Sequence, residues 1–268
     1  MIRRHRLGVP ALFATCLYLA ALAVGLAIAL ATGDLGVLWW VALFAAPDDA
    51  VQATPPNVLL LTLAGLVIAW GVWQCLRGPL TGPPVELDRN SRWLRVALYV
   101  SAATYLLNPF LTALPPWGAM VTLVPMLGVV LLFSAVLGRS RGHTVITIGF
   151  GVLGHAGGII TLTIALIVAE GEPLIMVSGL AALIWIVLIL RAQWDDDRWQ
   201  ESTVKYGALG LLLPILFTMA GALIAAPFEV YDDAVVVAGT LNVIWLARSA
   251  HDLAAPRVVP AADAHVLA

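Results

Sequence analysis

The sequence predicts an all-α, polytopic membrane protein, folded as one bundle of eight transmembrane helices. Apolar residues make up 61% of the 268 residues and charged residues only 11%, against roughly 25% charged residues in soluble domains. Eight apolar segments are each close to the ~20 residues that cross a bilayer as a helix. The loops between them are segregated by charge, because every cation falls in one set of loops.

The eight predicted spans are bounded by charged residues or by Pro and Gly. They cover residues 7–31, 57–76, 96–114, 117–137, 144–169, 173–190, 206–226 and 234–253. The last span contains Arg248, whose side chain we expect to extend to the membrane interface. Residues 36–46 are apolar but too few to span, so they either re-enter the membrane or lie flat on it, with Trp39 and Trp40 in the interfacial belt.

Charge placement predicts the orientation, since loops on the cytoplasmic side are rich in Lys and Arg. With the N-terminus inside, all 14 Lys and Arg residues fall on the cytoplasmic side. The opposite loops carry acids alone: Asp34, Asp48, Asp49, Glu170, Glu172, Glu229, Asp232 and Asp233. Lys205 is the single lysine, a bias typical of a high-GC bacterial genome. We therefore expect a bacterial cytoplasmic (inner) membrane protein with both termini in the cytoplasm.

Residues 1–268 form a single integral membrane domain in this interpretation, with a disordered tail at 255–268. The halves 7–140 and 144–253 resemble each other: "LLNPFL" (106–111) in the third span matches "LLLPIL" (211–216) in the seventh. Four helices per unit would give both copies one orientation. The pattern therefore favours a 4+4 parallel internal repeat related by an axis along the membrane normal.

His155 is the one histidine expected deep within a span. Gly151, Gly154 and Gly158 share a narrow arc of the same helix, with His155 at its edge, and small residues at this spacing let a neighbouring helix approach closely. We favour a neutral His155 hydrogen-bonded at this helix contact. A proton relay, or a haem or metal ligand, remains the functional alternative.

Asn108 and Asn242 are the other strongly polar intramembrane residues, one in each half. Asn108 precedes Pro109, which leaves a backbone carbonyl unbonded and could help to line a small polar cavity. The structural alternative is that both asparagines make interhelical hydrogen bonds. No Asp, Glu or Lys is expected within a hydrophobic core, which disfavours proton- or sodium-coupled transport.

The loop 191–207 is the densest polar segment and offers four carboxylates: Asp195, Asp196, Asp197 and Glu201. Carboxylate oxygens at this spacing could hold Mg²⁺, and the metal could bind a diphosphate. The loop resembles the second aspartate motif of the intramembrane aromatic prenyltransferases, which implies a helical bundle acting on a prenyl diphosphate. The chain departs from that family because it has only "VELDRN" (85–90) in place of an Asn-Asp motif and lacks a ninth helix. An acidic surface patch paired with Arg191, Arg198 and Lys205 is the alternative that we favour.

Two functions follow from these residues. The shortage of catalytic groups favours a non-enzymatic protein, either a small permease for an uncharged or amphiphilic solute or the membrane subunit of a transport complex, without a cofactor. Its partners would be the lipid bilayer and other membrane subunits or an ATPase. A net charge of -2 excludes no partner class but gives no sign of nucleic-acid binding. The alternative is a membrane enzyme that acts on a prenyl or lipid diphosphate with Mg²⁺ at the cytoplasmic face.

Overall fold

The computed structural model describes residues 5–47, 51–83, 85–111, 117–137, 141–168, 172–224, 230–231, 235 and 237–256. Residues 108–111, 117–119, 141–142, 165–168, 172–175 and 221–224 are described by their backbone alone. The described chain is all-helical, and its only β-type pairing is an isolated bridge between His5 and Leu80. The helices are α1 (Gly8–Thr32), α2 (Gly36–Leu43), α3 (Pro55–Leu76), α4 (Arg89–Leu111), α5 (Trp117–Leu137), α6 (Arg141–Val168), α7 (Glu172–Trp194), α8 (Glu201–Ile224), the short 3₁₀ helix η2 (Val237–Gly239) and α10 (Thr240–Leu253).

Local sequence signals explain several helix ends. Thr54 caps the N-terminus of α3, where its hydroxyl accepts a hydrogen bond from the Asn57 backbone N–H at 3.5 Å, and Pro55 occupies the first helical position, which needs no N–H donor. Gly33 ends α1 with φ of 74°, a left-handed conformation that a glycine adopts without a steric cost. Pro125 and Pro214 lie inside α5 and α8.

Among the residues that the structure describes, six helices contain a segment that is long and apolar enough to cross a membrane. These segments are Gly8–Thr32, Pro55–Leu76, Met120–Leu137, His143–Ile164, Met176–Trp194 and Glu201–Ala220. α4 and α10 are not among them. α4 begins with Arg89, Arg92 and Arg95 in its first two turns, and α10 has 14 residues, a length of roughly 21 Å against a hydrocarbon core of about 30 Å. The predicted count of eight spans is therefore not confirmed.

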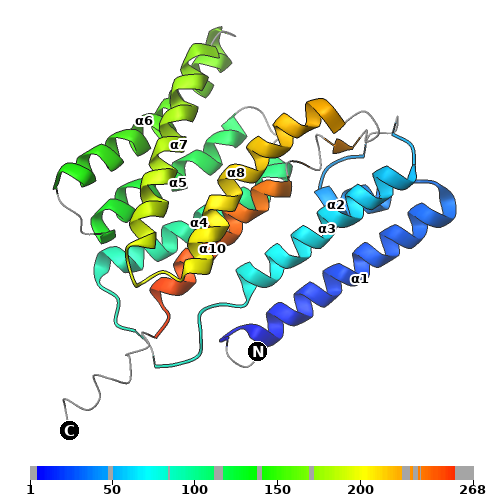
Figure 1. The fold of residues 1–268 in the computed structure, drawn as a ribbon, viewed down its shortest axis with the longest axis horizontal. Coiled ribbons are helices and arrows are strands. Elements are labelled where there is room, and N and C mark those ends of the chain that lie inside the picture. The colour runs from blue at the N-terminus through cyan, green and yellow to red at the C-terminus, as the bar shows by residue number, and fades with distance from the viewer. Residues whose placement is uncertain are drawn as a thin grey trace.

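α10 lies at the centre of the bundle and packs against α3, α4 and α8 (Figure 1). α1 packs against α3, and α2 fills the space between these two helices. On the other side, α5 packs against α4, and the α6–α7 hairpin packs against α5. The start of α1, the end of α3, the start of α8 and the end of α10 lie toward the lower side of Figure 1. We call this side the basic end, because Arg77, Arg191, Arg198, Lys205 and Arg248 belong to it.

The buried apolar side chains form two clusters. The larger joins α4, α5, α7, α8 and α10 around Phe133, Trp185 and Trp245. The smaller joins α1, α2 and α3 around Leu22, Leu38 and Leu61. α2 thus contributes to a core: Trp39 is buried in the smaller cluster, whereas its neighbour Trp40 is about half exposed.

The eighth predicted span differs most from its prediction. The described helix begins at Thr240, six residues after the predicted start at 234. Arg248 was expected to reach the interface, but its side chain is buried within the protein and donates hydrogen bonds to Gln200 Oε1 at 3.0 Å and Ser202 Oγ at 2.8 Å. The protein supplies the polar partners that water would otherwise provide. The 4+4 repeat between 7–140 and 144–253 is likewise not confirmed.

Candidate functional site

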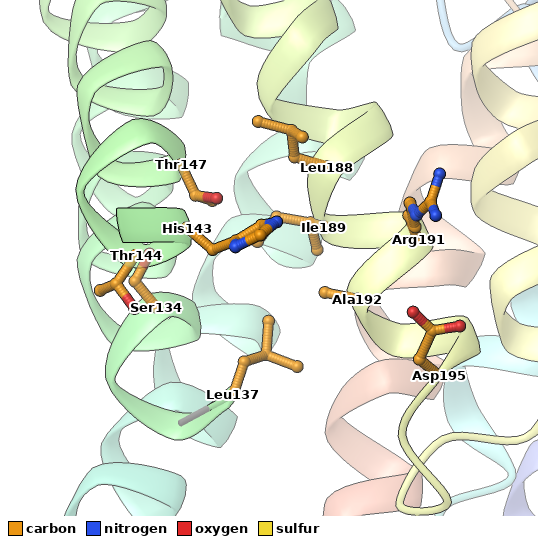
Figure 2. A pocket seen from close by; sticks show the side chains of 10 residues that line it. All are labelled: Ser134, Leu137, His143, Thr144, Thr147, Leu188, Ile189, Arg191, Ala192 and Asp195. Carbon is orange, nitrogen blue, oxygen red and sulfur yellow. The ribbon is translucent and has the colours of Figure 1, made fainter. Parts of the chain in front are cut away.

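A polar pocket of about 300 Å³ opens between the ends of α5, α6 and α7 at the basic end (Figure 2). α5 contributes Ser134 and Leu137, α6 contributes His143, Thr144 and Thr147, and α7 contributes Leu188, Ile189, Arg191, Ala192 and Asp195. Figure 2 shows the imidazole of His143 between the α6 and α7 backbones, with the two threonines on its own helix and Arg191 and Asp195 across from it. Hydroxyl, imidazole and charged groups therefore share this pocket with apolar side chains.

A second hollow, of about 520 Å³, runs along the contact between α7 and α8. Its lining is mostly apolar and consists of Val187, Leu190, Arg191, Trp194, Asp195, Val204, Ala208, Leu211 and Leu212. Arg191 and Asp195 line both hollows, so the last turns of α7 separate a polar pocket from an apolar groove. We call these two hollows together the α7 site. A polar head group and an apolar chain could each contact the surface that suits it.

The four carboxylates of the loop 195–201 have different surroundings. Asp196 accepts hydrogen bonds from the Arg198 guanidinium, with its Oδ2 at 2.6 Å from Arg198 Nη2. Glu201 pairs with Lys205 one turn later, and both side chains are exposed. Asp195 lines the α7 site and Asp197 is exposed. Among the residues that the structure describes, no group of three or more His, Cys, Asp or Glu side chains is placed to hold a metal ion.

A second partner of Arg198 explains the position of this loop. Its Nη2 also donates to the backbone oxygen of Val136 at 2.9 Å, which ties the α7–α8 loop to the end of α5. The guanidinium is held over the Trp199 ring, 5.0 Å from the centroid, and Trp199 is buried in the larger cluster. Asp196, hydrogen-bonded by Arg198 in a bidentate arrangement, therefore stabilises a loop conformation.

His155 is buried, with 5% of its surface exposed, against α7. Its Nδ1 lies 3.0 Å from the backbone oxygen of Gly151, and its ring meets the Trp185 ring edge-on at 5.3 Å. The glycines bring α6 and α7 close together, because a Cβ at Gly154 would lie 2.6 Å from the Ala182 backbone nitrogen and one at Gly151 would lie 2.6 Å from Trp185. Gly158 has ordinary room, since a Cβ there would lie 3.6 Å from Leu123.

The two asparagines are not brought to a common site. The Asn108 side chain lies outside the described residues. Asn242, on α10, donates from Nδ2 to the Gly210 backbone oxygen of α8 at 3.3 Å. Its Oδ1 is buried and has no hydrogen-bond partner within the described part of the chain.

A buried hydrogen-bond network joins α7, α8 and α10, and it was not predicted from the sequence. Gln193 of α7 donates to Ser249 at 3.1 Å and accepts from the Trp245 indole at 2.8 Å. Asp252 accepts from the Thr203 hydroxyl at 2.6 Å and from the Gln200 backbone N–H at 3.0 Å. Trp245, Ser249 and Asp252 follow the i, i+4, i+7 spacing of one helix face, which was a usable signal.

The polar members of the α7 site other than Asp195 were also absent from the predicted site residues. His143, Thr144 and Thr147 share one side of α6, at i, i+1 and i+4, and this spacing could have indicated a polar stripe. No family model, curated protein or solved structure matches this chain. The six apolar helical segments of the described chain are compatible with a membrane protein.

Proposed function

We propose that this chain is an integral protein of a bacterial inner membrane, with the basic end in the cytoplasm, that binds an amphiphilic solute at the α7 site. It would act as a small permease or as the membrane subunit of a transport complex. The observation that carries the proposal is the pairing of a polar pocket with an apolar groove across Arg191 and Asp195. The uneven placement of cations supports the orientation.

The composition of the two hollows supports an amphiphile as the solute. Ser134, Thr144 and Thr147 offer hydroxyl groups, and His143 offers ring nitrogens, to a polar head. The groove between α7 and α8 offers branched side chains and Trp194 to an alkyl chain. Both hollows fall within the range of small-molecule sites, about 300–1,000 Å³.

The orientation can be tested by cysteine labelling in a background that lacks Cys16 and Cys75. Asp34→Cys and Glu201→Cys place single exposed thiols at the two ends of the bundle. A membrane-impermeant maleimide added to intact spheroplasts is expected to label Asp34→Cys, and to label Glu201→Cys only after permeabilisation. The reverse pattern would place the basic end outside and contradict the proposed orientation.

The solute class can be tested with proteoliposomes that contain a fluorescent (NBD-labelled) phosphatidylglycerol. A permease is expected to speed its exchange between leaflets, read as the loss of protected fluorescence after external dithionite. Thr147→Leu fills the polar pocket and is expected to slow this exchange. Thr163→Leu is the matched control on the same helix, because Thr163 is exposed, bonds only its own helix at Ile159 and lies outside the pocket.

The same vesicles separate the two forms of the proposal. Quenching by a phospholipid with brominated chains, taken as the part of the tryptophan signal that Trp194→Phe removes, reports binding without movement if it is reduced in Thr147→Leu but not in Thr163→Leu. Binding without exchange indicates a transport subunit. If neither binding nor exchange depends on Thr147, the proposed function is wrong.

A further inference from the structure

A second group of basic side chains lies at the basic end, where α3 ends, α4 begins and α10 ends. Its members come from segments far apart in the sequence. We call it the cationic cluster, and it consists of His5, Arg77, Arg95, Arg248 and His251. None of these residues lines the α7 site.

Backbone hydrogen bonds hold the N-terminal member in place. The Arg6 N–H donates to the Pro79 oxygen at 3.0 Å, and the Leu7 N–H donates to the Arg77 oxygen at 3.1 Å. The His5 ring lies 3.3 Å from the Gly78 backbone oxygen. The segment before α1 is thus fixed against the segment after α3, which brings His5 and Arg77 to the same place.

Aromatic rings connect the members from α4 and α10. The Arg95 guanidinium lies over the Tyr99 ring, 5.5 Å from its centroid, and the His251 ring lies 5.7 Å from the same tyrosine. Arg248 lies over the Tyr206 ring at 5.2 Å. These contacts orient the cations through their flat faces and bring no negatively charged side chain to them.

The charge balance of the cluster is strongly positive. Burial, followed in order by the nearby Arg77, Arg248, Arg95 and His5, lowers the pKa of His251 to about 3. Burial and the nearby Arg77 also lower the pKa of His5. Asp252 is an acid that interacts with Arg77 and Arg248, and its Oδ2 already accepts hydrogen bonds from Thr203 and Gln200.

Three buried side-chain nitrogens of the cluster, two of them arginine donors, have no hydrogen-bond partner among the described residues. These nitrogens are Arg77 Nε, Arg95 Nε and His251 Nδ1. Each is buried, and none has a hydrogen-bond partner in the part of the chain that the structure describes. Other arginines are satisfied: Arg198 binds Asp196 and Val136, and Arg6 donates to the Gly82 oxygen. Buried donors are normally paired, and buried like charges are stable only with an anion nearby. Arg77 and Arg95 remain half-exposed, so an anion can reach them from the surface.

We propose that the cationic cluster binds a phosphate group, supplied either by an anionic phospholipid at the membrane surface or by a soluble phosphate. Planar guanidinium groups match phosphate oxygens in a bidentate fashion. Basic pockets between helices on the cytoplasmic side of a membrane are suited to phospholipid head groups. The proposal is independent of the α7 site and of the solute bound there.

The test measures the melting temperature of the full-length protein by tryptophan fluorescence in two arms. In the first, the protein is in a non-ionic detergent, and inorganic phosphate is compared with chloride at equal ionic strength, which separates binding from screening. In the second, the protein is in lipid nanodiscs in chloride buffer, and phosphatidylglycerol is compared with phosphatidylcholine. We expect a rise of about 3 °C or more in at least one arm, because a ligand that binds only the folded state stabilises it.

Three variants assign the effect to the cluster. Arg95→Gln and Arg77→Gln are each expected to lose most of the rise in melting temperature. Arg95→Lys is expected to keep part of it, because lysine retains the positive charge but not the paired N–H donors of the guanidinium group. Arg92→Gln is the matched control, since Arg92 lies one turn earlier on α4 with its side chain exposed. If Arg77→Gln fails to fold, Arg95→Gln and Arg95→Lys carry the test.

The two arms separate the sources of the phosphate. A rise with phosphatidylglycerol alone identifies a lipid head group, and a rise with inorganic phosphate identifies a soluble ligand. The proposal is overturned if neither arm shows a rise, or if Arg95→Gln and Arg92→Gln reduce it equally.

Discussion

α1 and α10 have opposite relations to the bundle. α1 is 25 residues long and apolar throughout, yet only Gly8, Ala11, Leu22, Gly25 and Ala29 are buried within the protein. α10 is 14 residues long and carries Arg, Ser, His and Asp in its second half, yet 12 of its residues are buried. In a membrane protein, hydropathy marks the surface that meets lipid, whereas the centre of a bundle can hold polar groups if they are paired.

The difference lies in what each helix contacts. The exposed face of α1 needs no partner, because lipid chains are as apolar as its leucines. α10 is surrounded by α3, α4 and α8, and each of its buried polar groups needs a protein partner. Gln193, Gln200, Ser202 and Thr203 provide partners for Arg248, Ser249 and Asp252 from α7, α8 and the loop between them.

The largest effect is expected from Asp252→Ala. This variant removes the acceptor of Thr203 and of the Gln200 N–H, and it takes away the acid beside the cationic cluster. Removal of one partner from a buried charged network costs 3–5 kcal/mol, so we expect a loss of about 4 kcal/mol in the free energy of unfolding. Unfolding by sodium dodecyl sulfate in mixed micelles, followed by tryptophan fluorescence, measures it.

Asp197→Ala is the control, because Asp197 is exposed in the α7–α8 loop. It is expected to change the free energy of unfolding by less than about 0.5 kcal/mol. Equal losses in the two variants would mean that the polar residues of α10 do not stabilise the bundle, and the contrast with α1 would disappear.

A smaller effect is expected from Leu22→Ala on α1. Leu22 is 3% exposed and packs so closely on α3 that a Cβ at Gly65 would meet its side chain. In lipid or detergent, the removed methyl groups lose packing contacts but no transfer free energy from water. We therefore expect the lost packing alone to lower the free energy of unfolding by about 2 kcal/mol. Leu17→Ala, 63% exposed on the same helix, is expected to cost less than about 0.5 kcal/mol in the same assay. A similar cost at both positions would show that α1 does not pack as described.

The smallest effect concerns pH and tests His251, the residue next to Asp252 in the last turn of α10. His251 lies in the last turn, beyond the six apolar segments, and burial among cations lowers its pKa to about 3 from an ordinary 6.5. Between these values the unfolded state binds more protons than the folded state. The stability contributed by neutral His251 is therefore present above pH 6.5 and is lost as the pH falls toward 3.

We expect a loss of about 1.5 kcal/mol between pH 6.5 and pH 5. Asp252 acts in the opposite direction, since burial raises its pKa and its contribution falls as the pH rises above its usual 3.8. The measurement is therefore the difference in slope between the wild type and His251→Gln, taken from unfolding titrations across that range. An unchanged slope in His251→Gln would show that this histidine is not held neutral by the fold.

The same contrast explains which helices could be predicted. The first predicted span, 7–31, differs from α1 by one residue at each end, because its apolar run and its glycine cap coincide with the helix. The predicted span 96–114 missed the first two turns of α4, where the helix continues through Arg89, Arg92 and Arg95. Hydropathy locates the apolar part of a helix and not its polar ends.

The site was harder to predict for a physical reason. The pairs Gln193–Ser249 and Thr203–Asp252 join residues 56 and 49 positions apart, so no local pattern connects them. His155 could be placed at a helix contact from the neighbouring glycines, but its aromatic partner Trp185 could not be identified. The polar pocket depends on how the end of α5, the start of α6 and the end of α7 pack against one another, and local sequence patterns do not specify this packing.

The hydrogen bonds of Arg6 and Leu7 to the segment after α3 also have a mechanical consequence. α1 and α3 are joined at one end by the chain through α2 and at the other by this clamp, so their hairpin is a closed ring. A force applied to the N-terminus would act on these two hydrogen bonds before it could separate α1 from the bundle. Detachment of α1 from its N-terminal end therefore requires that both of these hydrogen bonds break.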